Sequence, residues 1–266
     1  MPDPPSPLLA RYQLAQQIAR EAGQLTLRFF HDQQMEVEQK GDNTPVTAAD
    51  REAEKLLRHR IAEHFADDQI VGEEFPEQSG TSGYCWILDP IDGTKSFVSG
   101  VPLYCTLIGV TCQDVPQIGV INLPALGEMV SAASGQGAWY VRGRQTPCPA
   151  QVSRKQRLAE GLFCTSEVKT FTRRQREEVY RQLEQRAWLT RTWGDGYGYL
   201  LVATGRAELM VDAELHVWDA AAVLPVLQEA GGTFTDWEGN PTIHAGEGLA
   251  TNGQVLDEVL AITRGH

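Results

Sequence analysis

A short acidic run follows an apolar stretch of the sequence and has the form Asp89-Pro90-Ile91-Asp92-Gly93-Thr94. Hard divalent cations such as Mg²⁺ take a few oxygen ligands and keep part of their water shell. Asp89, at the end of an expected strand, and Asp92, in the turn after it, therefore predict a Mg²⁺ site. Pro90 fixes the backbone between them, and the carbonyl of Ile91 is a candidate for a further ligand because so tight a turn leaves it unpaired.

The end of the same run is suited to an anion. Gly93 lets a ligand approach the backbone closely, and Gly93-Thr94 are expected to begin a short helix through Phe97. Amides at the start of a helix are unpaired and attract phosphate. An isolated Asp-Gly pair is usually only a turn signal. The whole run, in contrast, brings cations and amides to one point and predicts a phosphate site.

Other acids stand in two distant segments, at Glu73-Glu74 after an apolar stretch and at Asp219 after Trp218. Each of these acidic segments, taken alone, has an explanation that needs no metal. Glu73-Glu74 suits a solvated strand end, and Asp219 suits a helix start, where an acid opposes the helix dipole. Clustered carboxylates repel one another unless a cation neutralises them. The combination of these acids with Asp89 and Asp92 therefore favours a metal site.

The three motifs resemble the inositol monophosphatase family of Mg²⁺-dependent phosphomonoesterases, and the resemblance covers nearly the whole chain. The residues that carry it are Gly72-Glu73-Glu74, Trp86 to Thr94, and Trp218-Asp219-Ala220-Ala221 with Glu229-Ala230-Gly231-Gly232. The resemblance implies metal ligands at Glu73, Asp89, Asp92 and Asp219 and at the carbonyl of Ile91. It also implies phosphate bound at Gly93 and Thr94, two or three Mg²⁺ ions, and Li⁺ as a candidate inhibitor.

The implied mechanism is direct attack by water that a divalent cation activates, with no covalent phosphoenzyme. Glu73 and Thr94 would orient this water, and Asp50 matches the family acid that hydrogen-bonds the threonine. Thr47-x-x-Asp50 also has the form of a helix capping box, so both roles are open for Asp50. Lys40 matches a family lysine near the metals, although lysines taken alone are usually surface residues.

Within the family, the chain looks most like the histidinol-phosphate phosphatase branch. The segments responsible are Asp89 to Phe97, Ser99 to Pro102, Gly194 to Tyr199 and Gly231 to Trp237. The implied reaction is hydrolysis of L-histidinol phosphate to L-histidinol and phosphate, a step of histidine biosynthesis. Inositol 1-phosphate or another small sugar or nucleotide phosphate is the alternative substrate. A regulatory or interaction protein on the same fold is the alternative of another class, but it is expected to have lost a metal ligand.

Two aspartates are the candidates for choosing the substrate. Histidinol phosphate carries an ammonium group and an imidazole that can be cationic, whereas inositol is neutral. Asp195 stands where inositol phosphatases tend to have a small uncharged residue, and Asp212 stands where the family usually has glutamate. Both would bind a cation through charge-assisted hydrogen bonds. Glu214, Tyr197 and, beside the metals, Glu74 are further candidates, although an aromatic residue at the spacing of Tyr197 is more often part of a core.

The composition agrees with an enzyme that acts on a small molecule. The chain has 266 residues, with 35 acidic and 23 basic side chains and a net charge of −12, which argues against nucleic acid as a partner. No apolar run approaches the roughly 20 residues of a membrane span, and Met1 to Pro5 lacks the features of a signal peptide. The five cysteines are odd in number and show no Cys-x-x-Cys spacing. We therefore expect a cytoplasmic protein with reduced cysteines.

The elements that must hold these residues form two halves of one compact unit, residues 1–146 with most metal ligands and residues 147–266 with Asp219 and the specificity residues. Helices are expected after Ser6 and Thr47, followed by strands at 103–111, 117–123, 128–133 and 138–141. Strands at 161–165, 188–192 and 207–211 then alternate with helices at about 172–186, around 200 and at 218–230. Such alternation predicts an α/β fold. The resemblance implies a layered α/β/α/β/α sandwich, as in fructose-1,6-bisphosphatases, and a homodimer.

Overall fold

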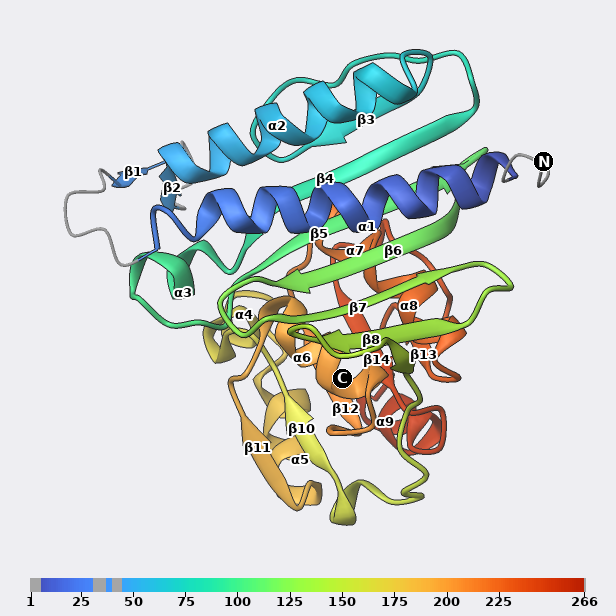
Figure 1. Ribbon diagram of the computed structural model, residues 1–266. Helices are drawn as coiled ribbons and strands as arrows, with labels where there is room; N and C mark the ends of the chain where they lie inside the picture. The colour runs from blue at the N-terminus through green and yellow to red at the C-terminus, as the bar shows by residue number, and fades with distance from the viewer. Residues whose placement is uncertain (1–5, 31–36, 40–44, 266) are drawn as a thin grey trace.

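The computed structural model describes residues 6–30, 37–39 and 45–265. Two long helices, α1 (Pro7–Thr26) and α2 (Ala48–His64), form the first layer and cover one face of a large sheet (Figure 1). Ser6 caps α1 by accepting a hydrogen bond from the amide of Leu9 at 3.3 Å. Thr47 and Asp50 form the capping box of α2. Both helix starts are as the sequence predicts.

The large sheet has seven strands in the order β3-β4-β5-β6-β7-β8-β9. The strands are β3 (Gln69–Gly72), β4 (Tyr84–Asp92), β5 (Cys105–Cys112), β6 (Val115–Leu123), β7 (Glu128–Ala133), β8 (Ala138–Arg142) and β9 (Cys148–Pro149). β3 pairs parallel with β4, and the other neighbours are antiparallel. The four strands predicted between residues 103 and 141 are confirmed. Separately, β1 (Val37–Gln39) and β2 (Pro45–Thr47) form an antiparallel pair.

The middle layer consists of α6 (Asp195–Ala203), α7 (Val217–Ala220) and α8 (Val223–Glu229). It is packed between the two sheets, because Ile87 and Leu107 of the large sheet share one apolar cluster with Leu200, Val226 and residues of the second sheet. The opposite face of β4 contributes Trp86 and Leu88 to the cluster beneath α1 and α2. β4 is thus buried on both faces along its central residues, which explains its long apolar stretch.

The second sheet has five strands in the order β11-β10-β12-β14-β13. They are β10 (Leu162–Cys164), β11 (Leu189–Arg191), β12 (Leu209–Asp212), β13 (Thr233–Thr235) and β14 (Gly248–Thr251), and a short 3₁₀ helix, η1 (Leu158–Glu160), precedes them. Three helices, α4 (Val168–Arg173), α5 (Glu177–Arg186) and α9 (Leu256–Thr263), pack on its outer face. The order of layers is therefore α/β/α/β/α, as predicted.

Two predicted helices are each divided in the structure. The helix expected at about 172–186 is replaced by α4 and α5, with a break at Gln175, whose φ of 58° is incompatible with a helix. The helix expected at 218–230 is divided into α7 and α8. Pro225 has no amide hydrogen for the carbonyl of Ala221, so a regular helix cannot continue there. In the part of the chain that the structure describes, no helix has the length and apolar character needed to cross a membrane.

Candidate active site

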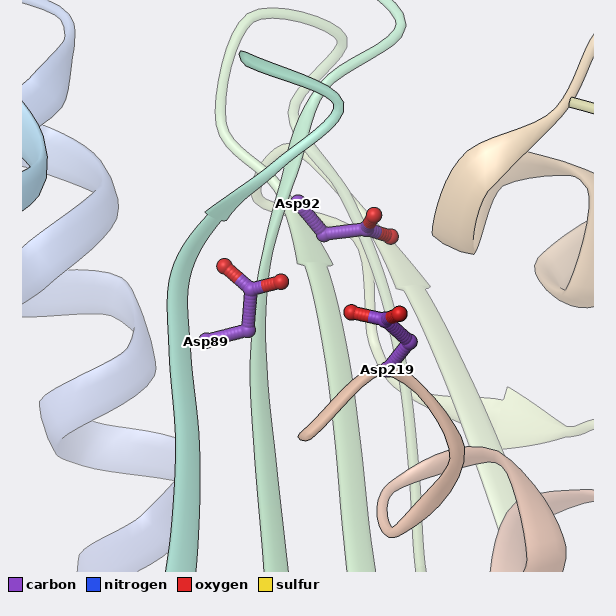
Figure 2. A group of neighbouring side chains, drawn as sticks. All are labelled: Asp89, Asp92 and Asp219. Carbon is purple, nitrogen blue, oxygen red and sulfur yellow. The ribbon is translucent and has the colours of Figure 1, made fainter. Parts of the chain in front are cut away.

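Three carboxylates from two distant segments meet at the carboxyl end of β4. Asp89, Asp92 and Asp219 each place one oxygen within 4.8 Å of the other two, as Figure 2 shows. Residues three apart on a regular strand face opposite sides. The pairing of β4 with β5 shifts its register between Asp89 and Asp92, and such a bulge changes the direction of a side chain. The bulge therefore lets both aspartates face Asp219, which belongs to α7.

The turn after β4 is held by its own polar groups. The amide of Ile91 donates to Oδ1 of Asp89 at 3.0 Å, and the hydroxyl of Thr94 donates to the carbonyl of Ile91 at 3.0 Å. Gly93 has a φ of 83°, which favours glycine, and precedes the helix α3 (Thr94–Val98). The predicted short helix is confirmed. The carbonyl of Ile91 was expected to be unpaired, but it accepts from Thr94 and keeps a second lone pair for a further partner.

Asp92 and Asp219 are both held by groups from the second half or from the strand beside β4. Oδ2 of Asp92 accepts a hydrogen bond from the amide of Gly196 at 2.5 Å and one from the thiol of Cys105 at 3.3 Å. Oδ2 of Asp219 accepts from the amide of His216 at 2.7 Å. A side chain at position 196 would collide with Cys105, since its Cβ would lie 2.2 Å from Sγ. Cys105 and Gly196 were not identified from the sequence, because nothing local marks them as neighbours of Asp92.

The negative charges of the cluster favour either bound protons or a bound cation. Burial, followed by the charges of Glu73, Asp92 and Asp219, raises the pKa of Asp89 well above its ordinary value. Burial, followed by Asp219, raises the pKa of Asp92 to about 8, and burial raises the pKa of Asp219 to about 7. Among the described residues, no lysine or arginine forms an ion pair with any of these three. A set of oxygen donors with unbalanced negative charge fits a hard divalent cation such as Mg²⁺.

The cluster opens into a cavity of about 760 Å³ between the two halves. Its lining includes Glu73, Asp89, Ile91, Asp92, Gly93, Thr94, Asp195, Asp212, Glu214 and Asp219. The structure thus brings together all the residues proposed for metal and phosphate and three acids proposed for the substrate. Another cavity, of about 450 Å³, lies beside β8 and the end of α8 and has none of these residues in its lining.

Asp195 lies directly beside the turn at Gly93. A Cβ added to Gly93 would come within 2.7 Å of Oδ2 of Asp195. Asp195 has a φ of 53° and donates its amide to the hydroxyl of Ser166 at 2.8 Å. Burial, followed by the charges of Asp92 and Asp212, raises its pKa well above the ordinary value. A cationic group in the cavity would offset the surrounding negative charge and favour the ionised form of this carboxyl group.

Asp212 is buried and is largely occupied by donors from the protein. Its Oδ1 accepts from the amide of Ser166 at 2.8 Å and from the hydroxyl of Thr165 at 3.4 Å. Its Oδ2 accepts from the hydroxyl of Tyr199 at 2.8 Å. Ser166 therefore connects Asp212 to Asp195, since its amide contacts one and its hydroxyl the other. The role of Tyr199 as a donor to Asp212 was not identified from the sequence.

Asp50 and Thr94 do not make the hydrogen bond expected between them. Oδ2 of Asp50 accepts from the amide of Thr47 at 2.8 Å and from its hydroxyl at 2.5 Å, while Thr94 donates to Ile91. Oδ1 of Asp50 is buried without a hydrogen-bond partner. Burial raises the pKa of Asp50, and the charge of Glu73 adds to the effect. In this structure the capping role therefore determines the position of Asp50, and one oxygen is left available.

Glu214, Glu74 and Tyr197 lie at the rim of the cavity or outside it. Glu214 is at the rim, where it is paired with Arg173, and this pairing holds the pKa of Glu214 below its ordinary value. Glu74 and Tyr197 are not part of the cavity lining. Tyr197 packs against the apolar cluster between the sheets instead. Lys40 lies outside the described residues.

Comparisons with known proteins agree on one family. A family model described as the inositol monophosphatase family matches residues 9–265. A histidinol-phosphatase of Chlorobaculum parvum is 44% identical over 95% of this chain and 96% of its own. A histidinol-phosphatase of Streptomyces coelicolor is 36% identical over 93% of this chain and 94% of its own. The crystal structure of the extragenic suppressor protein suhB from Bartonella henselae superposes with a TM-score of 0.87 at 26% identity and covers 96% of this chain and 98% of that one.

The raised pKa values predict how the stability of the metal-free protein depends on pH. Asp92, at about 8, and Asp219, at about 7, lie above the roughly 4 of an unfolded aspartate. The native chain then binds more protons than the unfolded chain between about pH 4 and pH 8, so the free energy of unfolding falls as pH rises through that interval. In EDTA, we expect Tm to fall by several degrees from about pH 5.5 to about pH 8, since 1 kcal/mol shifts Tm by about 2–4 °C at this size.

Mg²⁺ should raise Tm more at about pH 8 than at about pH 5.5, because protons compete with the ion below the pKa of its ligands. Thermal unfolding followed by fluorescence measures both effects. The D92N variant is the control, since removing one acid should flatten the pH dependence in EDTA and weaken the response to Mg²⁺. A wild-type Tm in EDTA that is constant or rises over this pH range, with an equal Mg²⁺ effect at both ends, would contradict the prediction.

Proposed function

This chain belongs to the inositol monophosphatase family and is a phosphatase, and we propose that its substrate is L-histidinol phosphate, which it hydrolyses to L-histidinol and phosphate in histidine biosynthesis. The observation that carries the choice of substrate is the position of Asp195, a carboxylate beside Gly93 in the cavity that holds the acidic cluster. The 44% identity to a histidinol-phosphatase over nearly the whole chain supports the same choice.

We propose Mg²⁺ as the cofactor, with two or three ions held by Glu73, Asp89, Asp92 and Asp219 and by the carbonyl of Ile91. The support is the fit of the site, an oxygen-only donor set whose aspartates lack a basic partner among the described ion pairs. A divalent cation bound there would activate water and stabilise charge on the phosphoryl and leaving oxygens. The proposal extends to Li⁺, which would inhibit by taking one of the Mg²⁺ positions.

The residues of the chain have three tasks in this reaction. Gly93 and Thr94 bind the phosphate through their backbone at the start of α3. Glu73 and the hydroxyl of Thr94 orient the attacking water, and the bond from Thr94 to the carbonyl of Ile91 sets the direction of that hydroxyl. Asp50 is not part of the cavity lining, and its unpartnered oxygen is free to accept a proton or a hydrogen bond.

The second half binds the leaving group. Asp195 accepts the ammonium or imidazolium group of histidinol through a charge-assisted hydrogen bond. Asp212 supports this contact by holding Ser166, whose hydroxyl accepts from the amide of Asp195, and contributes a second negative charge to the wall of the cavity. Tyr199 fixes the other oxygen of Asp212. Glu214 at the rim is a weaker candidate for substrate contact because Arg173 neutralises it.

Two alternatives follow from the family. Inositol 1-phosphate, or another small sugar or nucleotide phosphate, would use the same metal chemistry. A regulatory or interaction protein on this fold would not need a complete ligand set, yet all the proposed ligands line the cavity. This completeness favours catalysis.

The compartment and the assembly are proposed as well. We propose a cytoplasmic enzyme, which the five free cysteines support because reduced thiols persist in a reducing compartment. We propose a homodimer. The support is the edge strand β11, which is flanked by Trp188 and Trp193 with exposed fractions of 68% and 40%. Large exposed tryptophans beside a sheet edge favour a protein contact.

Turnover of several esters by the same preparation tests the proposed function. With Mg²⁺ present, kcat/KM for L-histidinol phosphate should exceed that for inositol 1-phosphate by about 100-fold or more, since one charge-assisted contact is worth about 1.5–3 kcal/mol and the second negative charge adds to it. Release of phosphate measures both rates. A kcat/KM for inositol 1-phosphate above that for histidinol phosphate would overturn the choice of substrate and leave the phosphatase chemistry intact.

Replacing Asp195 with Asn tests the cation contact itself. The variant should lose about 10- to 100-fold in kcat/KM for histidinol phosphate, because the charge-assisted hydrogen bond is lost. Hydrolysis of glycerol 2-phosphate, an uncharged alcohol's ester, should change little. D212N is the matched comparison, and its loss should also be larger on histidinol phosphate but smaller than that of D195N, because Asp212 acts through Ser166 and its own oxygens are occupied by protein donors. An equal loss on both esters in D195N would remove this residue from substrate selection.

A further inference from the structure

A glutamate with no assigned role lies beneath the segment that carries Glu73. Glu54, on α2, is fully buried and is not part of the cavity lining. A buried carboxylate is costly unless it is paired and hydrogen-bonded. Its Oε1 accepts from Nε of Arg58 at 2.8 Å, one turn later on the same helix. Its Oε2 accepts from the backbone amide of Glu74 at 2.8 Å.

The contacts of this ion pair converge on the backbone that follows β3. Nη2 of Arg58 also donates to the carbonyl of Phe75 at 3.0 Å. The ion pair therefore binds the two residues directly after Glu73. On the other side, the amide of Glu73 donates to the carbonyl of Leu88 on β4 at 3.2 Å. The backbone of Glu73 is fixed in this way between β4 and α2.

Gly72 shows how closely the carboxylate fits against this backbone. A Cβ at position 72 would lie only 2.1 Å from Oε1 of Glu54, a distance at which something must shift. The glycine before Glu73 is therefore required by the buried carboxylate. The short distance between position 72 and the carboxylate of Glu54 is an observation independent of the hydrogen bonds to Glu74 and Phe75. Both observations indicate that Glu54 holds the backbone next to Glu73.

We propose that Glu54 is a positioning residue for the metal site, which it serves by anchoring residues 72–75 so that Glu73 faces Asp89 and Asp219. The inference rests on the proposed role of Glu73 as a metal ligand. Glu73 lines the same cavity as Asp89 and Asp219, which places it beside the cluster. Partners that fix a metal ligand typically contribute a factor of about 10–100 to metal affinity or activity. Glu54 therefore sets the affinity for Mg²⁺ without touching the ion or the substrate.

The test compares E54Q with E52Q. Both variants remove one acidic charge from α2, but Glu52 is exposed whereas Glu54 is buried. In E54Q, the side-chain amide would present a donor either to the backbone amide of Glu74 or to the guanidinium of Arg58, and the ion pair with Arg58 would be lost. Titration calorimetry with Mg²⁺ alone, on metal-free protein, should show about 10- to 100-fold weaker binding for E54Q and unchanged binding for E52Q.

The dependence of activity on the Mg²⁺ concentration distinguishes a positioning role from a merely structural one. For E54Q, the Mg²⁺ concentration at half-maximal turnover should rise by the same factor, while KM for the ester at saturating Mg²⁺ stays near that of the wild type. A purely structural role would lower Tm in EDTA and leave the Mg²⁺ affinity of the folded protein unchanged. Unchanged Mg²⁺ affinity in folded E54Q would overturn the inference.

A second variant covers the case in which E54Q does not fold. G72A keeps the Glu54–Arg58 ion pair but pushes the carboxylate away from the backbone, so it should weaken Mg²⁺ binding in the same direction. Wild-type affinity in G72A would overturn the inference. Failure of the proposed function can be distinguished from failure of this inference. If the wild-type protein binds no Mg²⁺, the proposed metal site itself is wrong. If the wild-type protein binds Mg²⁺ and the variants bind it equally well, only the proposed role of Glu54 is wrong.

Discussion

The mutual repulsion of Asp89, Asp92 and Asp219 is the constraint on which the rest of the structure depends. Their oxygens lie within 4.8 Å of one another and no lysine or arginine among the described residues pairs with them. Such a cluster stays folded only if its acids hold protons or a cation binds. The raised pKa values correspond to acids that hold protons, and the metal-dependent chemistry of the family corresponds to a bound cation. The same electrostatic repulsion that destabilises the metal-free protein would therefore favour the binding of a divalent cation.

Several structural details are needed to hold this cluster. The bulge in β4 turns two aspartates towards one point, and Pro225 helps to divide the chain so that α7 ends soon after Asp219. Gly109 and Gly119 allow the break between α7 and α8 to press on the large sheet, because a Cβ at either position would lie 2.5 Å or less from Ala221 or Ala222. The middle layer thus reaches the end of β4 through close backbone contacts, and the two halves complete one site.

Much of the site could be predicted from the sequence, because its chemistry lies in short segments. The acids, the turn at Gly93, the capping box at Asp50 and the order of layers all follow from local patterns or from the family resemblance. The partners of these residues could not be predicted in the same way. Gly196 holds Asp92 and Tyr199 holds Asp212 through contacts between elements, and a sequence pattern does not show which elements meet. The break between α4 and α5 falls in the polar run 172–178, which holds no glycine or proline to mark it, and the break between α7 and α8 falls among alanines that favour a helix.

The proposed function assigns the reaction and the choice of substrate to different places in the chain. In this proposal the end of β4 and the start of α3 provide the metal and phosphate contacts, while Asp195, Ser166 and Asp212 form the wall that receives the alcohol. Ser166 joins the two aspartates of this wall, and Gly196 joins the wall to Asp92. Under this proposal, a change of substrate is expected to involve residues of the second half.

Anomalous diffraction from crystals soaked with Mn²⁺, which shares the oxygen-rich, octahedral preferences of Mg²⁺, is the most direct test of the metal site. The expected result is an anomalous peak bounded by the carboxylates of Asp89, Asp92 and Asp219, with the carbonyl of Ile91 and the carboxylate of Glu73 on the same side of the cavity. Mn²⁺ bound only at the surface, with the three carboxylates unchanged and no peak between them, would contradict the metal-centred interpretation of this fold.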